Sequence, residues 1–141
     1  MENRSNCPVS CALDFVGDKW SLLIVRDLFL NVNTYSDFLK SPEKIATNIL
    51  VDRLKKLREN GIIDFRRGER DKKIKYYYLT ELGIDMYPIT IELAMWSKKH
   101  LVKQLNTFSL KYLDSIAELG KEKHYEDTIT RLKSTLPKAL N

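Results

Sequence analysis

The sequence predicts a mainly α-helical chain with one small β-hairpin, an α+β fold class with additional helices at its C-terminal end. Three observations indicate it: apolar residues recur at helical spacing over most of the 141 residues, two short β-rich runs flank a polar segment near the middle, and the apolar content is 43%. Such an apolar content is ordinary for a globular protein, and a chain of this length buries roughly 68% of its unfolded surface without a metal or disulfide. We therefore expect one domain at 1–104 and a helical extension at 105–141.

The first third of the chain predicts three helices. Residues 8–16 show a short helical pattern, and residues 19–30 are apolar enough for a largely buried helix. Residues 34–39 predict a short third helix capped by the Thr34 side chain. The helix ends before Pro42, because the residue that precedes a proline avoids the α conformation.

Residues 46–60 predict a fourth helix with two different sides. An apolar stripe on one side would pack on the preceding short helix, so the opposite side faces outward. Two helices joined by a short turn, with the second facing outward, have helix-turn-helix geometry. The apolar stripe consists of Leu50, Leu54 and Leu57, and the outward side consists of Thr47, Asn48, Val51, Asp52 and Lys55.

Two strands follow this helix, at 62–66 and 74–79. Their residues have high β-propensity, and the loop between them is polar with one glycine. The loop carries long cationic side chains suited to DNA backbone phosphates or a minor groove, namely Arg67, Arg70, Lys72 and Lys73. A hairpin in this position is a wing, so the predicted architecture is a winged helix-turn-helix.

A further helix is expected to begin at Thr80. Apolar residues recur in it at spacings of four and three, which is typical of a seam along which two helices pack. The seam residues are Leu82, Met86, Ile89, Leu93 and Trp96. Pro88 lies within this helix and is expected to bend it. Two later stripes, at 105–119 and 125–136, are interpreted as core or dimer packing rather than as a binding groove.

The positive charge is concentrated in one part of the chain. The net charge is +5, yet residues 40–80 contain 12 Lys and Arg against 6 Asp and Glu, while the remainder contains 12 against 13. A concentrated basic segment is typical of proteins that bind a polyanion, because each neutralised phosphate releases counterions. A solvated basic face is the alternative for charge alone. The order of the helices and the hairpin favours double-stranded DNA as the partner.

Other function classes find little support in the sequence. There is no Gly-rich phosphate loop and no nucleophile–base constellation, and neither histidine has an evident catalytic partner. Two cysteines without zinc-ligand spacing suit a reducing compartment. We therefore expect no enzyme activity, no cofactor and no metal. No signal peptide is evident and no run approaches the roughly 20 apolar residues of a membrane span, so we expect a cytoplasmic protein without a membrane partner.

A winged-helix module that binds protein or RNA without reading an operator stays open as the alternative. The two readings differ in the outward side of the helix at 46–60. A protein-docking face should be apolar, whereas Asn48, Asp52 and Lys55 keep this one polar. The polar face favours DNA.

Several motifs occur in the order found in one known family. They are Cys7-Pro8-Val9, then ALDFVGDKWSLLIVRDL, then IATNILVDRLKKLRENGII, then YYYLTELG. On these motifs the chain resembles the HxlR-type, MarR-like winged helix-turn-helix family of bacterial transcriptional regulators, over about residues 7–101. The resemblance implies a homodimer that binds a pseudo-palindromic operator and represses or activates nearby genes. It also implies that the N-terminal helix and the helix after the wing build the dimer. The sequence departs from the family pattern in its KSPEK loop and its long tail.

The resemblance also implies roles for individual residues. It assigns base readout to Thr47, Asn48, Val51 and Asp52, and it places Arg53 and Lys55 nearer the DNA backbone. The chemistry is suitable, because Asn pairs bidentately with adenine, Asp accepts from cytosine N4, and Thr or Val contacts a thymine methyl. A salt bridge within the domain is the alternative for Arg53. A solvated face is expected for Lys56 and Arg58.

Cys7 occupies the position at which some family members keep a redox- or electrophile-sensing thiol. It precedes Pro8 at a predicted helix start, where the helix dipole favours a thiolate. Cys11 would lie on the same helix face. The alternative is that both cysteines are small buried hydrophobic residues. An oxidant or a small molecule is therefore considered as an effector.

Overall fold

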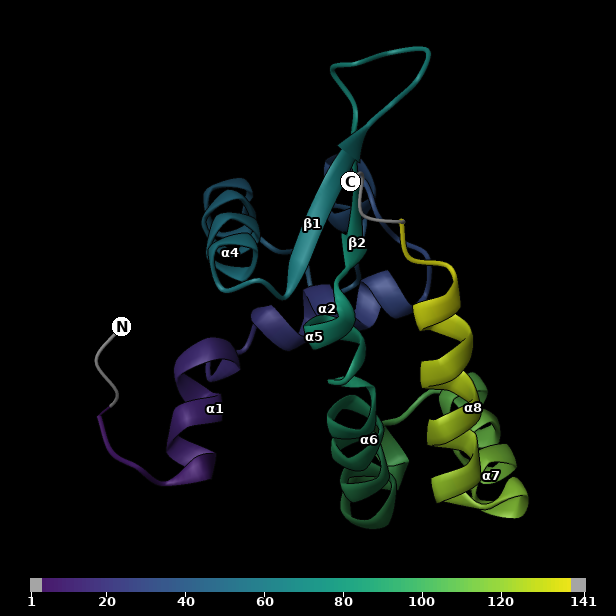
Figure 1. The fold of residues 1–141 in the computed structure, drawn as a ribbon. Helices are drawn as coiled ribbons and strands as arrows, with labels where there is room; N and C mark the ends of the chain where they lie inside the picture. The colour runs from purple at the N-terminus through teal and green to yellow at the C-terminus, as the bar shows by residue number, and fades with distance from the viewer. Residues whose placement is uncertain (1–3, 138–141) are drawn as a thin grey trace. The chain divides into compact units, whose positions relative to one another are not determined.

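The computed structural model describes residues 4–137 and divides the chain into two compact units, one up to Gly83 and one from Ile84 onward (Figure 1). The elements in chain order are α1 (Pro8–Val16), α2 (Ser21–Phe29), α3 (Tyr35–Phe38), α4 (Thr47–Glu59), β1 (Ile63–Arg67), β2 (Lys75–Leu79), α5 (Glu81–Ile84), α6 (Tyr87–Leu101), the 3-10 helix η1 (Val102–Gln104), α7 (Thr107–Leu119) and α8 (Lys121–Ser134). The predicted class is confirmed: the fold is mainly helical, with an antiparallel hairpin wing after a helix-turn-helix and further helices toward the C-terminus.

The core of the first unit is built from α2, α3, α4 and the start of the hairpin. The predicted stripe of α4 is confirmed, since Leu50, Leu54 and Leu57 are all buried. Further buried side chains in this unit include Ile24, Val25, Leu28, Phe38, Ile45, Ile62, Ile63 and Leu79. With one side of α4 buried, its other side is necessarily turned to solvent.

Local side chains fix the start of α3 and of α5. The Thr34 hydroxyl accepts a hydrogen bond from the Asp37 N–H at 3.3 Å, as expected for an N-cap. The Thr80 hydroxyl accepts from the Gly83 N–H at 3.3 Å and donates to the Ile62 carbonyl at 3.1 Å. The Thr80 side chain therefore caps the start of α5 and also bonds to the turn that follows α4.

The hairpin pairs Ile63 with Leu79, Phe65 with Tyr77 and Arg67 with Lys75. Both strands begin one residue later than the sequence predicts. The Tyr77 N–H donates to the Asn33 carbonyl at 2.8 Å, so β2 is also attached to the segment before α3. The hairpin loop projects beyond the helices of its own unit in Figure 1.

The helix expected after the wing is interrupted. Asp85 and Met86 form a turn between α5 and α6, and Pro88 is the second residue of α6. The prediction of one helix bent at Pro88 was therefore wrong. A proline in the first helical turn removes no intrahelical hydrogen bond, so Pro88 begins a helix here rather than bending one.

The second unit packs α6, α7 and α8 around few buried residues, which include Tyr87, Ile91, Leu113 and Ile116. A polar aromatic cluster joins the three helices: the Tyr87 hydroxyl is 2.7 Å from the Tyr112 hydroxyl and 2.8 Å from His124 Nε2. The stripe predicted at 105–119 is only partly buried, since Phe108 and Leu119 are exposed. The helix instead buries Leu113, which lies beside the predicted stripe.

Candidate nucleic-acid interface

The outward side of α4 is exposed and mostly polar. Thr47, Asn48 and Lys55 are exposed, as is Val51, whose exposed fraction is 55%. Asp52 is half-buried. The N-cap residue Ala46 offers no side-chain hydrogen bond, so the first-turn N–H groups of α4 are not capped by it. The structure thus places the predicted base-reading residues together on one accessible helix face.

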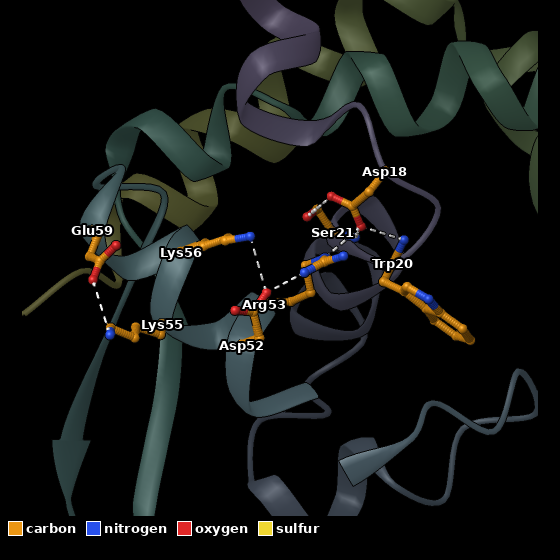
Figure 2. A network of polar contacts seen from close by, with 8 residues as sticks. All are labelled: Asp18, Trp20, Ser21, Asp52, Arg53, Lys55, Lys56 and Glu59. Carbon is orange, nitrogen blue, oxygen red and sulfur yellow. Dashed lines mark hydrogen bonds and ion pairs between the residues drawn. The ribbon is translucent and has the colours of Figure 1, made fainter. Parts of the chain in front are cut away.

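A polar network joins this face to the start of α2 (Figure 2). The Asp18 carboxylate accepts hydrogen bonds from the N–H groups of Trp20 at 2.8 Å and Ser21 at 2.9 Å, and from the Ser21 hydroxyl at 2.5 Å. It also accepts from Arg53 Nε of α4 at 3.1 Å. Arg53 forms a second ion pair with Asp52. The helix α2 begins at Ser21 rather than at residue 19.

The environment of Asp18 favours its charged form. Burial opposes ionisation of this carboxyl, but the Ser21 hydroxyl, the two backbone N–H groups and Arg53 together outweigh burial and lower its pKa to about 2. Asp18 is therefore an anion at neutral pH. Arg53 forms the intradomain salt bridge that the sequence left as an alternative to a DNA backbone contact.

Asp52 is held from two sides. Lys56, one turn further along α4, lies 3.3 Å from Asp52 Oδ2, the same oxygen that Arg53 contacts. Lys56, and after it Arg53, lower the pKa of Asp52. Lys56 is exposed, as expected for a solvated face, and its ammonium forms an ion pair with Asp52 on the proposed reading face.

The turn before α4 is fixed by a second ion-pair cluster. Arg26 of α2 contacts both carboxylate oxygens of Glu43, at 2.5 Å and 3.1 Å, and the Ser41 hydroxyl donates to Glu43 at 2.5 Å. The hydrogen bond from Arg26 is the largest influence that lowers the pKa of Glu43 to about 2. Lys44 adopts the left-handed conformation with φ of 54°. The KSPEK loop thus reaches α4 through a fixed turn.

The wing loop is closed by backbone hydrogen bonds at its base. The Gly68 N–H donates to the Ile74 carbonyl at 2.9 Å, and Arg67 Nη1 donates to the Lys72 carbonyl at 3.0 Å. A Cβ at Gly68 would lie 2.6 Å from the Asp71 carbonyl oxygen, so a side chain does not fit there. The predicted phosphate-contacting residues Arg67, Arg70, Lys72 and Lys73 are all exposed.

A cationic cluster around the Phe65 ring of β1 was not predicted from the sequence. Arg58 lies 4.3 Å, Lys75 4.6 Å and Arg67 5.6 Å from the centre of the Phe65 ring. Arg58 also pairs with Asp64 at 3.0 Å and is exposed, as expected for a solvated face. Strand alternation could have indicated this cluster. Phe65 and Arg67 share one face of β1, and Lys75 is the cross-strand neighbour of Arg67.

Cys7 is exposed at the N-cap of α1, immediately before Pro8. Cys11 is half-buried, and its thiol donates to the Ser5 carbonyl at 3.4 Å. The alternative in which both cysteines are buried hydrophobic residues was therefore wrong. Neither cysteine forms a disulfide.

The seam residues lie on two separate helices, Leu82 on α5 and the others on α6 or in the turn before it. Their exposed fractions are 53% for Leu82, 42% for Ile89, 53% for Leu93 and 59% for Trp96, and Met86 is half-buried. Ile89, Leu93 and Trp96 recur at spacings of four and three along α6, and an exposed apolar row on one helix is unusual for a surface that contacts only water. Its role in a dimer stays a prediction.

The part of the chain that the structure describes offers neither a metal site nor a membrane span. Residues 4–137 contain no group of three or more His, Cys, Asp or Glu side chains placed to hold a metal ion. The helices among them are too short or too polar to cross a membrane. A hollow lined by Trp20, Phe38 and Leu50 measures about 10 Å³, room for about one water molecule and not for an effector.

Comparison with known proteins agrees with this geometry. Residues 15–105 match the family model described as HxlR-like helix-turn-helix. The chain is 27% identical over 99 residues to YdeP of Bacillus subtilis, an uncharacterized HTH-type transcriptional regulator, covering 70% of this chain and 77% of YdeP. A solved structure, that of PA1607, described as a putative transcription factor, is 34% identical in sequence to this chain. It has a TM-score of 0.65 and covers 70% of this chain and 68% of PA1607.

A redox regulator is also among the similar structures. HypR in its oxidized form is 25% identical to this chain, with a TM-score of 0.60 over 67% of this chain and 97% of HypR. The family consists of transcriptional regulators and not of enzymes. The chain therefore belongs to the HxlR-like helix-turn-helix family of transcriptional regulators.

Proposed function

We propose that the chain acts as a homodimer that binds a pseudo-palindromic operator in double-stranded DNA and controls transcription from it. The observation that carries this proposal is the exposed, polar side of α4 in the same unit as a cationic wing. A helix face of this kind suits the major groove, and long cations suit the backbone phosphates.

The two parts of the interface have different tasks. Asn48 and Asp52 read base edges, with Thr47 and Val51 against thymine methyl groups. Arg70, Lys72 and Lys73 of the wing loop, with Arg67 at its base and Lys55 on α4, hold the phosphates. Base contacts select a sequence, whereas phosphate contacts supply affinity for any sequence.

The dimer is supported by apolar side chains that the single chain leaves exposed. They lie on α6, as described, and on α1, where Val9 is 66% and Leu13 is 51% exposed. A two-fold dimer would place two copies of α4 about 34 Å apart, one helical turn of DNA, which is why a pseudo-palindrome is expected.

The division of tasks is testable with two kinds of variant. Asn48→Ala should relax base preference while retaining binding to unrelated duplexes. Arg70→Ala and Lys72→Ala should weaken binding to all duplexes and reduce the slope of log K against log salt by about one for each lost phosphate contact. Binding of the wing variants that equals wild type at every salt concentration would contradict the phosphate role. Preferential binding to RNA would favour the alternative module.

We further propose that an oxidant or electrophile is the effector and that Cys7 receives it. Support comes from the exposed position of Cys7 at the start of α1 and from the likeness to HypR, described as a redox regulator. Cys7→Ser should bind DNA like wild type but retain that binding in diamide, and Cys11→Ser is the matched control. If Cys7→Ser loses binding in diamide as wild type does, Cys7 is not the sensor.

A further inference from the structure

We propose that Asp18 is a positioning residue for base recognition: through Arg53, it fixes the orientation of the Asp52 carboxylate on the exposed side of α4. The inference rests on the proposed function, because it assumes that Asp52 reads a base. It concerns a residue outside the helix-turn-helix, 35 positions before Arg53 in the chain.

The Asp18 carboxylate is anchored independently of α4. The N–H groups of Trp20 and Ser21 and the Ser21 hydroxyl all donate to it, at 2.5–2.9 Å. These donors belong to the first residue of α2 and to the residue before it, and the Ser21 side chain is buried. Three bonds to one rigid helix end hold the carboxylate in place, so its contact with Arg53 is made from a fixed point.

Arg53 connects the fixed Asp18 carboxylate to Asp52 on the exposed side of α4 (Figure 2). Its Nε donates to Asp18 and its Nη1 to Asp52, so the two contacts use different edges of one planar group. Because the guanidinium is rigid and planar, holding one edge sets the direction of the other. The Arg53 side chain is only 21% exposed, which leaves it little room to turn away.

The anchored contact leaves one oxygen of Asp52 for a base. Among the described residues, each hydrogen bond and ion pair of Asp52 in the structure uses Oδ2, with Arg53 and Lys56 as partners. A carboxylate has further acceptor positions, so Oδ1 can accept from an exocyclic amine such as cytosine N4 while Oδ2 stays held. The side chain is thus ordered before DNA binds.

Loss of the Asp18 charge should lower base discrimination at one base pair of the operator. The substitution Asp18→Asn keeps an oxygen that can accept from the Trp20 and Ser21 N–H groups but removes the anionic partner of Arg53. Ordering a freed side chain on binding should lower discrimination at the base pair that Asp52 reads by about 2- to 10-fold. Asp37→Asn is the matched control, because it removes one negative charge near the start of α3 instead.

The test measures the affinity of wild type, Asp18→Asn, Asp52→Asn and the double variant for selected duplexes substituted one base pair at a time. The proposal predicts that Asp18→Asn and Asp52→Asn reduce discrimination at the same base pair and that the double variant loses no more than Asp52→Asn alone. Unchanged discrimination, equal loss at every base pair, or losses that multiply in the double variant would overturn it.

A second variant covers the case in which Asp18→Asn does not fold. Arg53→Lys keeps the charge but lacks the planar fork, so it should reduce discrimination at the same base pair, and its failure to do so would overturn the proposal. A wild type that discriminates at no base pair of any duplex would instead refute the proposed function.

Discussion

Glu43→Gln tests whether the turn before α4 depends on the Arg26–Glu43 ion pair. The substitution keeps the size of the side chain and removes its charge. Arg26, whose side chain is 33% exposed, would then retain Asp27 at 2.8 Å as its carboxylate partner. The first unit should lose stability, because a half-buried guanidinium is left less well compensated.

The expected loss follows from the pKa of Glu43. A fall in the pKa from 4.5 to about 2 corresponds to at most about 3.4 kcal/mol at neutral pH. The Glu43 side chain is 32% exposed, so solvent screening reduces this figure. Burial raises the pKa of Asp27, and the negative charge of Glu43 raises it further. Removing the Glu43 charge relieves this repulsion and so offsets a small part of the lost stability. We expect Glu43→Gln to lower the free energy of unfolding by about 1–2 kcal/mol.

The loss should depend on pH in a defined direction. Because the pKa of Glu43 in the folded state is lowered, its contribution is fully present above about pH 4.5 and disappears as the pH falls toward 2. We would measure urea unfolding by circular dichroism at pH 7, 4 and 3. The free energies of unfolding of wild type and Glu43→Gln should become more similar as the pH falls. Glu69→Gln, in the exposed wing, is the control. A difference that is absent at pH 7, or that stays constant down to pH 3, would refute the reasoning.

Three further predictions concern other contacts. Gly83→Ala should cost about 2 kcal/mol in thermal unfolding, because the new Cβ would lie 2.2 Å from the Ile62 carbonyl oxygen; an unchanged Tm would contradict it. Asn106→Ala should cost about 1 kcal/mol, because its side chain accepts from the Ser109 N–H at 2.8 Å; Asn106→Asp should restore stability, and equal stability of both variants would count against the cap. Lys75→Ala should reduce the salt slope of duplex binding by about one, while Arg66→Ala, on the opposite face of the hairpin, should not; equal slopes would remove the Phe65 cluster from the interface.

The sequence predicted those features that depend on local patterns. Leu50, Leu54 and Leu57 recur at helical spacing, so the buried and exposed sides of α4 followed directly. Thr34 lies immediately before a short apolar face, which is the ordinary position of a cap. The tyrosine-rich run gave β2 to within one residue.

Features that depend on tertiary placement were not predictable in the same way. The Asp18–Arg53 bond joins residues far apart in the chain, and nothing in the local pattern of either residue selects the other. The sequence spacing from Leu82 to Trp96 continues across the turn at Asp85 and Met86, so periodicity could not reveal that these residues belong to two separate helices. The stacking of Arg58 on Phe65 was not predictable either, because it requires the hairpin to fold back toward α4.

The central claim is that the exposed side of α4 reads a DNA sequence. The most direct measurement is to incubate the wild-type protein with a random duplex library at fixed salt, recover the bound fragments and sequence them. We predict one enriched motif with two related half-sites, and a variant with Asn48→Ala should lose enrichment at defined positions of each half-site. Recovery of fragments without any shared sequence, with affinity that depends on salt alone, would contradict it.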